Sequence, residues 1–293
     1  MVRVRRRKQG RGMAGFEIAT ASADDVRTMV GWARDEGWNP ANTDSVAFHA
    51  MDPGGFLIGR LSGEPATCIS VVRYGATFAF LGFYIARPFA RGKGYGIRVW
   101  RAGMARLAGR NVGLDGVPAQ QDNYRRSGFR LAWQNVRYEG MPARADLPAR
   151  VSLVDARSIA FDRLAAYDRR FFPETRDSFL APWITAPERT ALVAVKDGSL
   201  VGFGVVRAAV AAPRVGPLYG ATPDIAAALA SALGRATAGG AIAIDVPEIN
   251  PAALKLAADL GLKPAFPTAR MYTGANPAVD YAGLFGVTSL ELG

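Results

Sequence analysis

The stretch Arg87-Pro-Phe-Ala-Arg-Gly-Lys-Gly-Tyr-Gly96 decides the fold of this 293-residue chain. A strand-like segment, 78–85, leads into it, and a helix-like segment, 97–107, leads out of it. Its three glycines let backbone N–H groups approach a ligand without interference from a Cβ atom. The free N–H groups and partial positive charge of the helix N-terminus favour a phosphate, and Arg91 and Lys93 add two cations. The stretch therefore predicts a pyrophosphate-binding loop between a strand and a helix.

The spacing of the glycines separates this loop from two common nucleotide-binding loops. Tyr95 and Gly96 follow Gly94, so the hydroxyl that ends Gly-x-x-x-x-Gly-Lys-Ser/Thr and binds magnesium is missing. The dinucleotide pattern Gly-x-Gly-x-x-Gly also fails, because the last glycine comes one residue too early. An ordinary glycine-rich turn remains the alternative interpretation.

With Pro88 three residues before Arg91, the sequence Arg91-Gly-Lys-Gly-Tyr-Gly96 resembles the Arg/Gln-x-x-Gly-x-Gly acyl-CoA loop of the GNAT acetyltransferases. After residue 13 the chain resembles bacterial GNAT N-acetyltransferases with an additional C-terminal GNAT-like domain. Phrases typical of that subgroup are Asp52-Pro-Gly-Gly-Phe56, Gly113-Leu-Asp-Gly-Val117 and Thr268-Ala-Arg-Met-Tyr-Thr-Gly274. The resemblance implies an α/β fold, with a mixed sheet and flanking helices, built as a tandem of two similar GNAT-like halves.

The resemblance also implies an activity, the acetyl-CoA-dependent acetylation of a primary amine. The acceptor would be a small molecule or an amino-acid-like compound that attacks directly in a ternary complex. A non-catalytic acyl-CoA-binding regulator is the alternative. No metal is implied, and a homodimer is compatible with the sequence.

Individual residues take roles from the same resemblance. Ile85 and Ala86, at the end of the strand, would bond the pantetheine and acetyl group through their backbones. Tyr124, four residues before Gly128-Phe129, matches the family's Tyr-x-x-x-Gly-Phe pattern and would protonate the departing thiolate, unless it is a core aromatic. At Val117 the family commonly has asparagine. The pyrophosphate would be held by Arg91, Gly92, Lys93, Gly94, Tyr95 and Gly96.

The group that takes the proton of the amine is left open by the sequence. Asp115, Glu139 and Tyr84 are candidates in the first half of the chain. Asp245 and Glu248, from the second half, could instead orient a cationic acceptor if the halves face each other. Two tryptophans in loop-like segments could line the acceptor pocket or pack in a core: Trp38 and Trp183.

The order of predicted elements is repeated, which indicates two domains. We predict an acetyl-CoA-binding catalytic domain at 14–140, a proline-containing linker at 141–150 and a GNAT-like domain at 151–293. Where the first domain has its loop, the second has Arg214-Val-Gly-Pro-Leu-Tyr-Gly220, in which Pro217 has no N–H. We therefore predict that the second domain lacks the pyrophosphate loop.

Charge and composition narrow the function classes further. The net charge is +11, but six Lys and Arg residues precede Met13, and without them it is +5. We expect residues 1–13 to be a basic, disordered leader; nucleic-acid binding is the less favoured reading because no aromatic residues alternate with the charges.

The single cysteine and the single histidine exclude other sites. One cysteine, Cys68, excludes an internal disulfide and fits a reducing cytoplasm. With His49 as the only histidine, a metal site of clustered Cys and His is excluded. No apolar stretch is long enough to span a membrane, so we expect a cytoplasmic protein.

Overall fold

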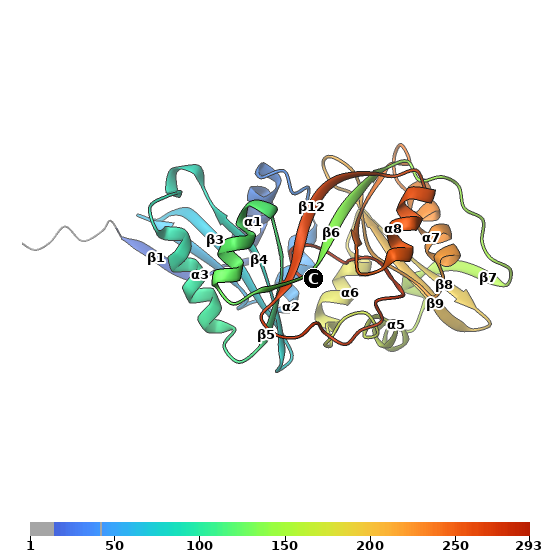
Figure 1. The fold of residues 1–293 in the computed structure, drawn as a ribbon, viewed down its shortest axis with the longest axis horizontal. Helices are drawn as coiled ribbons and strands as arrows, with labels where there is room; N and C mark the ends of the chain where they lie inside the picture. Colours follow the sequence, from blue (N-terminus) through green and yellow to red (C-terminus); the bar gives the residue numbers. More distant parts are fainter. Residues whose placement is uncertain (1–14, 42) are drawn as a thin grey trace, which may run out of the picture.

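One sheet of 13 strands runs through the molecule and joins its two halves (Figure 1). The computed structural model describes residues 15–41 and 43–293, so the predicted basic leader at 1–13 lies outside the described residues. The strand order is β1-β2-β3-β4-β5-β12-β6-β11-β10-β9-β8-β7, with β13 pairing to β10. The β4–β5 and β10–β11 pairs are parallel and the others antiparallel. The predicted mixed α/β fold is confirmed.

In the first half of the chain, the predicted strand 78–85 and the predicted helix 97–107 are present as β4 and α3. Helix α1 begins at a capping box, in which the Ser22 hydroxyl and the Asp25 carboxylate each accept an N–H of the other residue. The elements are β1 (Phe16–Thr20), α1 (Ala23–Asp35), α2 (Asp44–Met51), β2 (Phe56–Leu61), β3 (Glu64–Tyr74), β4 (Phe78–Ala86), α3 (Tyr95–Arg106), β5 (Asn111–Gly116), α4 (Gln121–Arg126) and β6 (Arg130–Gly140).

The second half repeats this order and adds a short last strand. Helix α7 packs on β8, β9 and β10, as α3 packs on β2, β3 and β4. The elements are β7 (Val151–Asp155), α5 (Phe161–Asp168), α6 (Asp177–Thr185), β8 (Arg189–Lys196), β9 (Ser199–Arg207), β10 (Arg214–Gly220), α7 (Pro223–Arg235), β11 (Ile242–Pro247), α8 (Pro251–Asp259), β12 (Lys263–Tyr272) and β13 (Leu284–Gly286).

Residues 214–220 are a buried strand, so the expectation that they occupy the place of the loop was wrong. This strand, β10, pairs antiparallel with β9 and parallel with β11, as β4 pairs with β3 and β5. Only Ala221 and Thr222 separate it from α7, and the Thr222 hydroxyl accepts the N–H of Ile225 and caps that helix. In the first half, residues 87–94 separate β4 from α3. The second half therefore has no room for a phosphate loop.

The two halves exchange their last strands at the centre of the molecule (Figure 1). Strand β12 pairs with β5, β6 pairs with β11, and β6 and β12 pair with each other. The predicted linker, 141–150, separates the halves along the chain, whereas sheet pairing crosses between them. Each half of the sheet is completed by a strand of the other half.

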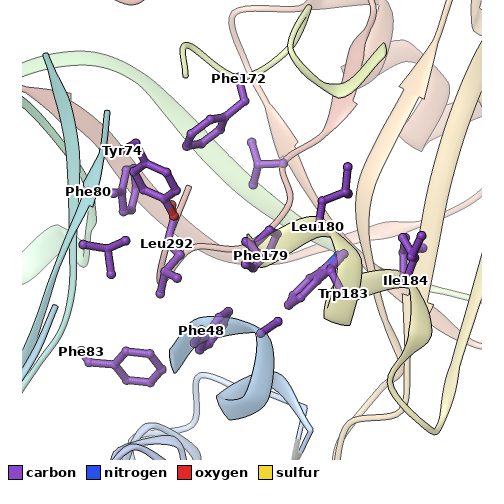
Figure 2. Close-up of a cluster of buried hydrophobic side chains, with 14 of the residues drawn as sticks. Phe48, Tyr74, Phe80, Phe83, Phe172, Phe179, Leu180, Trp183, Ile184 and Leu292 are labelled. Atoms are coloured by element: carbon purple, nitrogen blue, oxygen red, sulfur yellow. The ribbon is translucent and has the colours of Figure 1, made fainter. Parts of the chain in front are cut away.

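An aromatic core joins α2 of the first half to α6 of the second half. Figure 2 shows Phe48 of α2 facing Phe179 and Trp183 of α6, with ring centroids of Phe48 and Trp183 5.9 Å apart. Trp183 lies in helix α6, not in a loop, and is fully buried, so of the two readings that the sequence left open the structure supports packing in a core. Burial of four apolar side chains stabilises α6 as a helix despite its internal Pro182.

Candidate active site

Strands β4 and β5 separate just before the glycine loop, and a cavity of about 670 Å³ opens there. The two strands pair only from Phe78 to Leu81 on the β4 side. Beyond Leu81 a bulge shifts the register of β4 against β3, and Phe83 holds a positive φ of 46°. A non-glycine residue rarely adopts this conformation, and such strain is often kept at functional sites. The end of β4 thus has backbone groups that are free of β5.

Most of the sequence-predicted cofactor residues line this cavity. They are Ile85, Ala86, Arg91, Gly92, Gly94 and Gly96. Lys93 does not line it and is exposed at the tip of the loop. Tyr95 does not line it either, because its ring stacks on Phe16 with centroids 4.7 Å apart.

The loop has the geometry of an anion site. Gly92 and Gly94 hold φ angles of 72° and 79°, which favour glycine. Gly94 is the N-cap of α3, and no side chain caps that helix, so the N–H groups of its first turn are available to a ligand.

Arg91 ties the loop to the strand end and to α1. Its Nε donates to the carbonyl oxygen of Ala86 at 2.8 Å, and its guanidinium forms an ion pair with Glu36. The Ala86 carbonyl is therefore occupied, and a phosphate that binds Arg91 must compete with Glu36.

Tyr124 reaches the cavity from α4. Its ring stacks on Trp100, with centroids 5.7 Å apart, and Trp100 contacts Tyr84. Within residues 15–41 and 43–293, the Tyr124 hydroxyl has no hydrogen-bond partner. Burial, with the nearby Tyr84 phenol, raises the pKa of Tyr124 to about 12. The phenol is therefore a neutral, unengaged hydrogen-bond donor at the cavity wall.

Among the sequence candidates for proton transfer, only Asp115 and Tyr84 line the cavity. The Asp115 carboxylate accepts two bonds from Arg270, at 2.8 and 2.7 Å, and one from Asn135 at 2.7 Å. Burial raises the pKa of Asp115 while Arg270 opposes the rise. Asp115 is therefore held in place by an ion pair.

The two acids proposed from the second half lie elsewhere. Asp245 does not line the cavity, because its carboxylate pairs with Arg137 at 2.8 Å and with Arg214. Burial acts to raise the pKa of Asp245, but the two arginines hold it at about 2. Glu139 and Glu248 also lie outside the cavity wall.

Trp38 forms part of the wall, as the sequence suggested, and the second half of the chain holds it there. Its carbonyl oxygen accepts hydrogen bonds from Arg137 at 3.0 Å and from Arg214 at 3.1 Å. Four other lining residues, which sequence reasoning missed, come from the second half: Phe266, Thr268, Leu290 and Glu291. No local motif marks them, because the exchange of β12 and the path of the C-terminal segment bring them to the site.

Two negative findings complete the site. Within the part of the chain that the structure describes, no helix is long and apolar enough to cross a membrane. The same residues contain no cluster of three His, Cys, Asp or Glu side chains suited to a metal ion.

Comparisons with known proteins identify the family. The chain is 31% identical over 275 residues to a holothin acyltransferase of Pseudoalteromonas sp. (strain SANK 73390), and the match covers 93% of each protein. The chain belongs to the GNAT acetyltransferase family. The family's acetyltransferase (GNAT) domain model matches residues 164–286 of this GNAT acyltransferase, which lie in its second half.

Solved structures agree on the fold. A putative acetyltransferase from Pyrococcus horikoshii superimposes with a TM-score of 0.81 and 20% identity, covering 99% of both chains. A tandem GNAT protein from the clavulanic acid biosynthesis pathway superimposes with a TM-score of 0.63 and 17% identity, over 89% of this chain and 100% of the other. The tandem GNAT architecture predicted from the sequence is confirmed.

Proposed function

We propose that this GNAT acyltransferase transfers an acetyl group from acetyl-CoA, held by its first half, to a primary amine of a small molecule. The proposal rests on one observation: the loop before α3, the free end of β4 and Tyr124 all line the same cavity. These three features match the three parts of a thioester donor: its pyrophosphate, its carbonyl and its sulfur.

Each part of the donor has a physical partner. The N-terminus of α3 offers uncapped N–H groups and a partial positive charge to the pyrophosphate. The end of β4, free of β5, offers backbone N–H groups to the carbonyl oxygen, where negative charge develops. Tyr124 keeps its proton at neutral pH and donates it to the departing thiolate.

The acceptor side of the cavity is shaped by both halves. Trp38, Phe266 and Leu290 give it an apolar wall, which suits a small, largely apolar amine. The relative named as a holothin acyltransferase supports a small-molecule acceptor. The unengaged Tyr124 hydroxyl favours an enzyme over a non-catalytic acyl-CoA-binding regulator. Nucleic-acid binding by the leader, the cytoplasmic location and a homodimer stay predictions.

The test combines an activity screen with one matched pair of variants. The full chain is incubated with acetyl-CoA and a panel of amines while free thiol is followed and the amide is detected by mass. Gly94→Asp places a carboxylate in the loop, and Gly109→Asp places one at an exposed glycine with a similar φ of 81°. Calorimetry should show at least a tenfold loss of acetyl-CoA affinity for the first variant only. Equal affinity in both variants would refute the loop assignment.

A further inference from the structure

The segment 287–293 is buried between the halves and anchored by both. The N–H of Val287 donates to the Asp245 carbonyl oxygen at 3.0 Å, and Arg207 donates to the Thr288 carbonyl oxygen at 3.2 Å. From the first half, the Tyr74 hydroxyl donates to the Leu292 carbonyl oxygen at 2.9 Å. Figure 2 places Leu292 between the aromatic side chains of the two halves. The path of this segment is therefore fixed at several points.

The segment crosses β4 where the gap to β5 opens. A Cβ atom built on Gly82 would lie 2.1 Å from the carbonyl oxygen of Glu291, so only glycine allows this approach. Gly82 comes one residue after Leu81, the last residue of β4 that pairs with β5. Glu291 therefore packs on the strand beside the free backbone that we assign to the acyl carbonyl.

Glu291 is an incompletely satisfied buried carboxylate. It lines the cavity and is 3% exposed, and among the described residues its Oε2 has no hydrogen-bond partner. Burying a carboxylate without full hydrogen bonding is costly, so such a group is commonly kept for a function. The other titratable groups on the cavity differ from Glu291. Asp115 is bound by Arg270, Glu36 is paired with Arg91, and the two tyrosines are neutral.

The charges around Glu291 and its burial hold the pKa of its carboxyl group above the ordinary value. Burial raises its pKa, the guanidinium groups of Arg214, Arg207 and Arg137 oppose the rise, and the carboxylate of Asp44 adds to it. A carboxyl group with a raised pKa is a better base for an amine than an ordinary surface carboxylate.

We propose that Glu291, supplied by the second half, is the general base that takes the proton of the acceptor amine. The inference rests on the proposed function and deepens it. The amine nitrogen forms a bond to the acyl carbon, the carbon–sulfur bond breaks, and the nitrogen loses one proton to the Glu291 carboxylate. The thiolate receives a proton from Tyr124. Glu291 then releases its proton to solvent, and Tyr124 takes up a proton from solvent, which restores the enzyme. In the overall reaction, acyl-CoA and amine are converted to amide and CoA thiol.

The decisive variant is Glu291→Gln, because glutamine has nearly the same size and shape as glutamate but has no carboxylate to accept a proton. We expect kcat to fall about 100-fold, the acetyl-CoA Kd to stay within about twofold, and the acidic limb of the kcat/KM–pH profile to disappear. The defect should be smaller for an aromatic amine, which is neutral at pH 7, than for an alkylamine. Glu248→Gln is the matched control at an exposed glutamate outside the cavity, and it should behave as wild type.

The outcomes separate this inference from the proposed function. An active wild type whose Glu291→Gln variant keeps full kcat and the acidic limb overturns the inference alone. A wild type that binds acetyl-CoA yet acylates no amine overturns the proposed function and this inference with it. If the Glu291→Gln variant does not fold, the pH profile of kcat/KM is measured for the wild type with an aromatic amine, and this profile tests the inference. Loss of kcat/KM on acidification, at pH values where the aromatic amine stays neutral, supports the base, and a flat profile overturns it.

Discussion

Replacing Gly82 by alanine tests the crossing of β4 and the segment 287–293. The added Cβ would lie 2.1 Å from the carbonyl oxygen of Glu291 and 2.9 Å from its carbonyl carbon. Ordinary van der Waals contact begins at 3.4 Å. The oxygen and the new methyl must therefore move apart by about 1.3 Å, the difference between 3.4 and 2.1 Å.

The size of this displacement sets two expected effects. Forcing a methyl into a well-packed site costs about 1–3 kcal/mol of the free energy of unfolding. A displacement of about 1 Å in a group that takes part in the reaction costs about 100-fold in rate. The loop before α3 is not touched by the change, so the Kd of acetyl-CoA should stay within about twofold.

Urea unfolding, kcat for amide formation and calorimetry with acetyl-CoA measure the three quantities. The control is Gly31→Ala in α1, because a Cβ there meets nothing within 4 Å. That change should leave kcat unaltered and stabilise the protein by up to about 1 kcal/mol. If Gly82→Ala keeps wild-type stability and kcat, the segment does not lie against β4 and the reasoning fails.

Three further predictions concern the cavity and the arginines behind it. Tyr124→Phe should lower kcat about 100-fold with an unchanged acetyl-CoA Kd, and because the pKa of Tyr124 is about 12, no loss of activity from its ionisation should appear in a pH–rate profile below about pH 11. Trp38→Ala should raise the KM of the acceptor severalfold while calorimetry shows the acetyl-CoA Kd unchanged; equal KM values would remove Trp38 from the acceptor wall. Asp245→Asn should lower the free energy of unfolding by about 3–5 kcal/mol, because it leaves Arg137 and Arg214 buried without their carboxylate. Since the pKa of Asp245 is lowered to about 2, its contribution is present above its ordinary pKa and is lost as the pH falls towards 2, so urea titrations of the two proteins should converge on acidification.

The parts of the site that are local in sequence could be predicted. The spacing of apolar residues and the positions of the glycines predicted β4, the loop and α3. The family's Tyr-x-x-x-Gly-Phe pattern pointed to Tyr124, which lies on α4. Strand β10 was missed because Gly216 and Pro217 are typical of a turn, yet long-range pairing with β9 and β11 determines its structure.

The part of the cavity wall that we assign to the acceptor could not be predicted, because it depends on contacts between distant segments. Nothing local in β12 indicates that it inserts between β5 and β6. Buried Arg137 and Arg214 are equally hidden, since arginine is usually exposed and only the fold reveals their partner Asp245.

The gap between β10 and β11 in the second half is filled differently from the gap between β4 and β5 in the first half. Strand β10 pairs with β11 only at Arg214 and Val215, as β4 pairs with β5 only up to Leu81. In the first half that gap is the cavity, whereas in the second half β13 pairs with β10 at the far end of the strand and packs against β11. The chain therefore fills the second gap with its own backbone.

The same segment then continues into the first half. After β13 it runs past β10 to β4, where Leu290 and Glu291 join the wall of the open cavity. One stretch of chain, β13 with the segment that follows it, therefore fills the gap between β10 and β11 and adds to the wall of the cavity between β4 and β5. Two residues stand in the second half where the first half has its glycine loop, and under the proposed function the second half shapes the acceptor side of the first half's cavity.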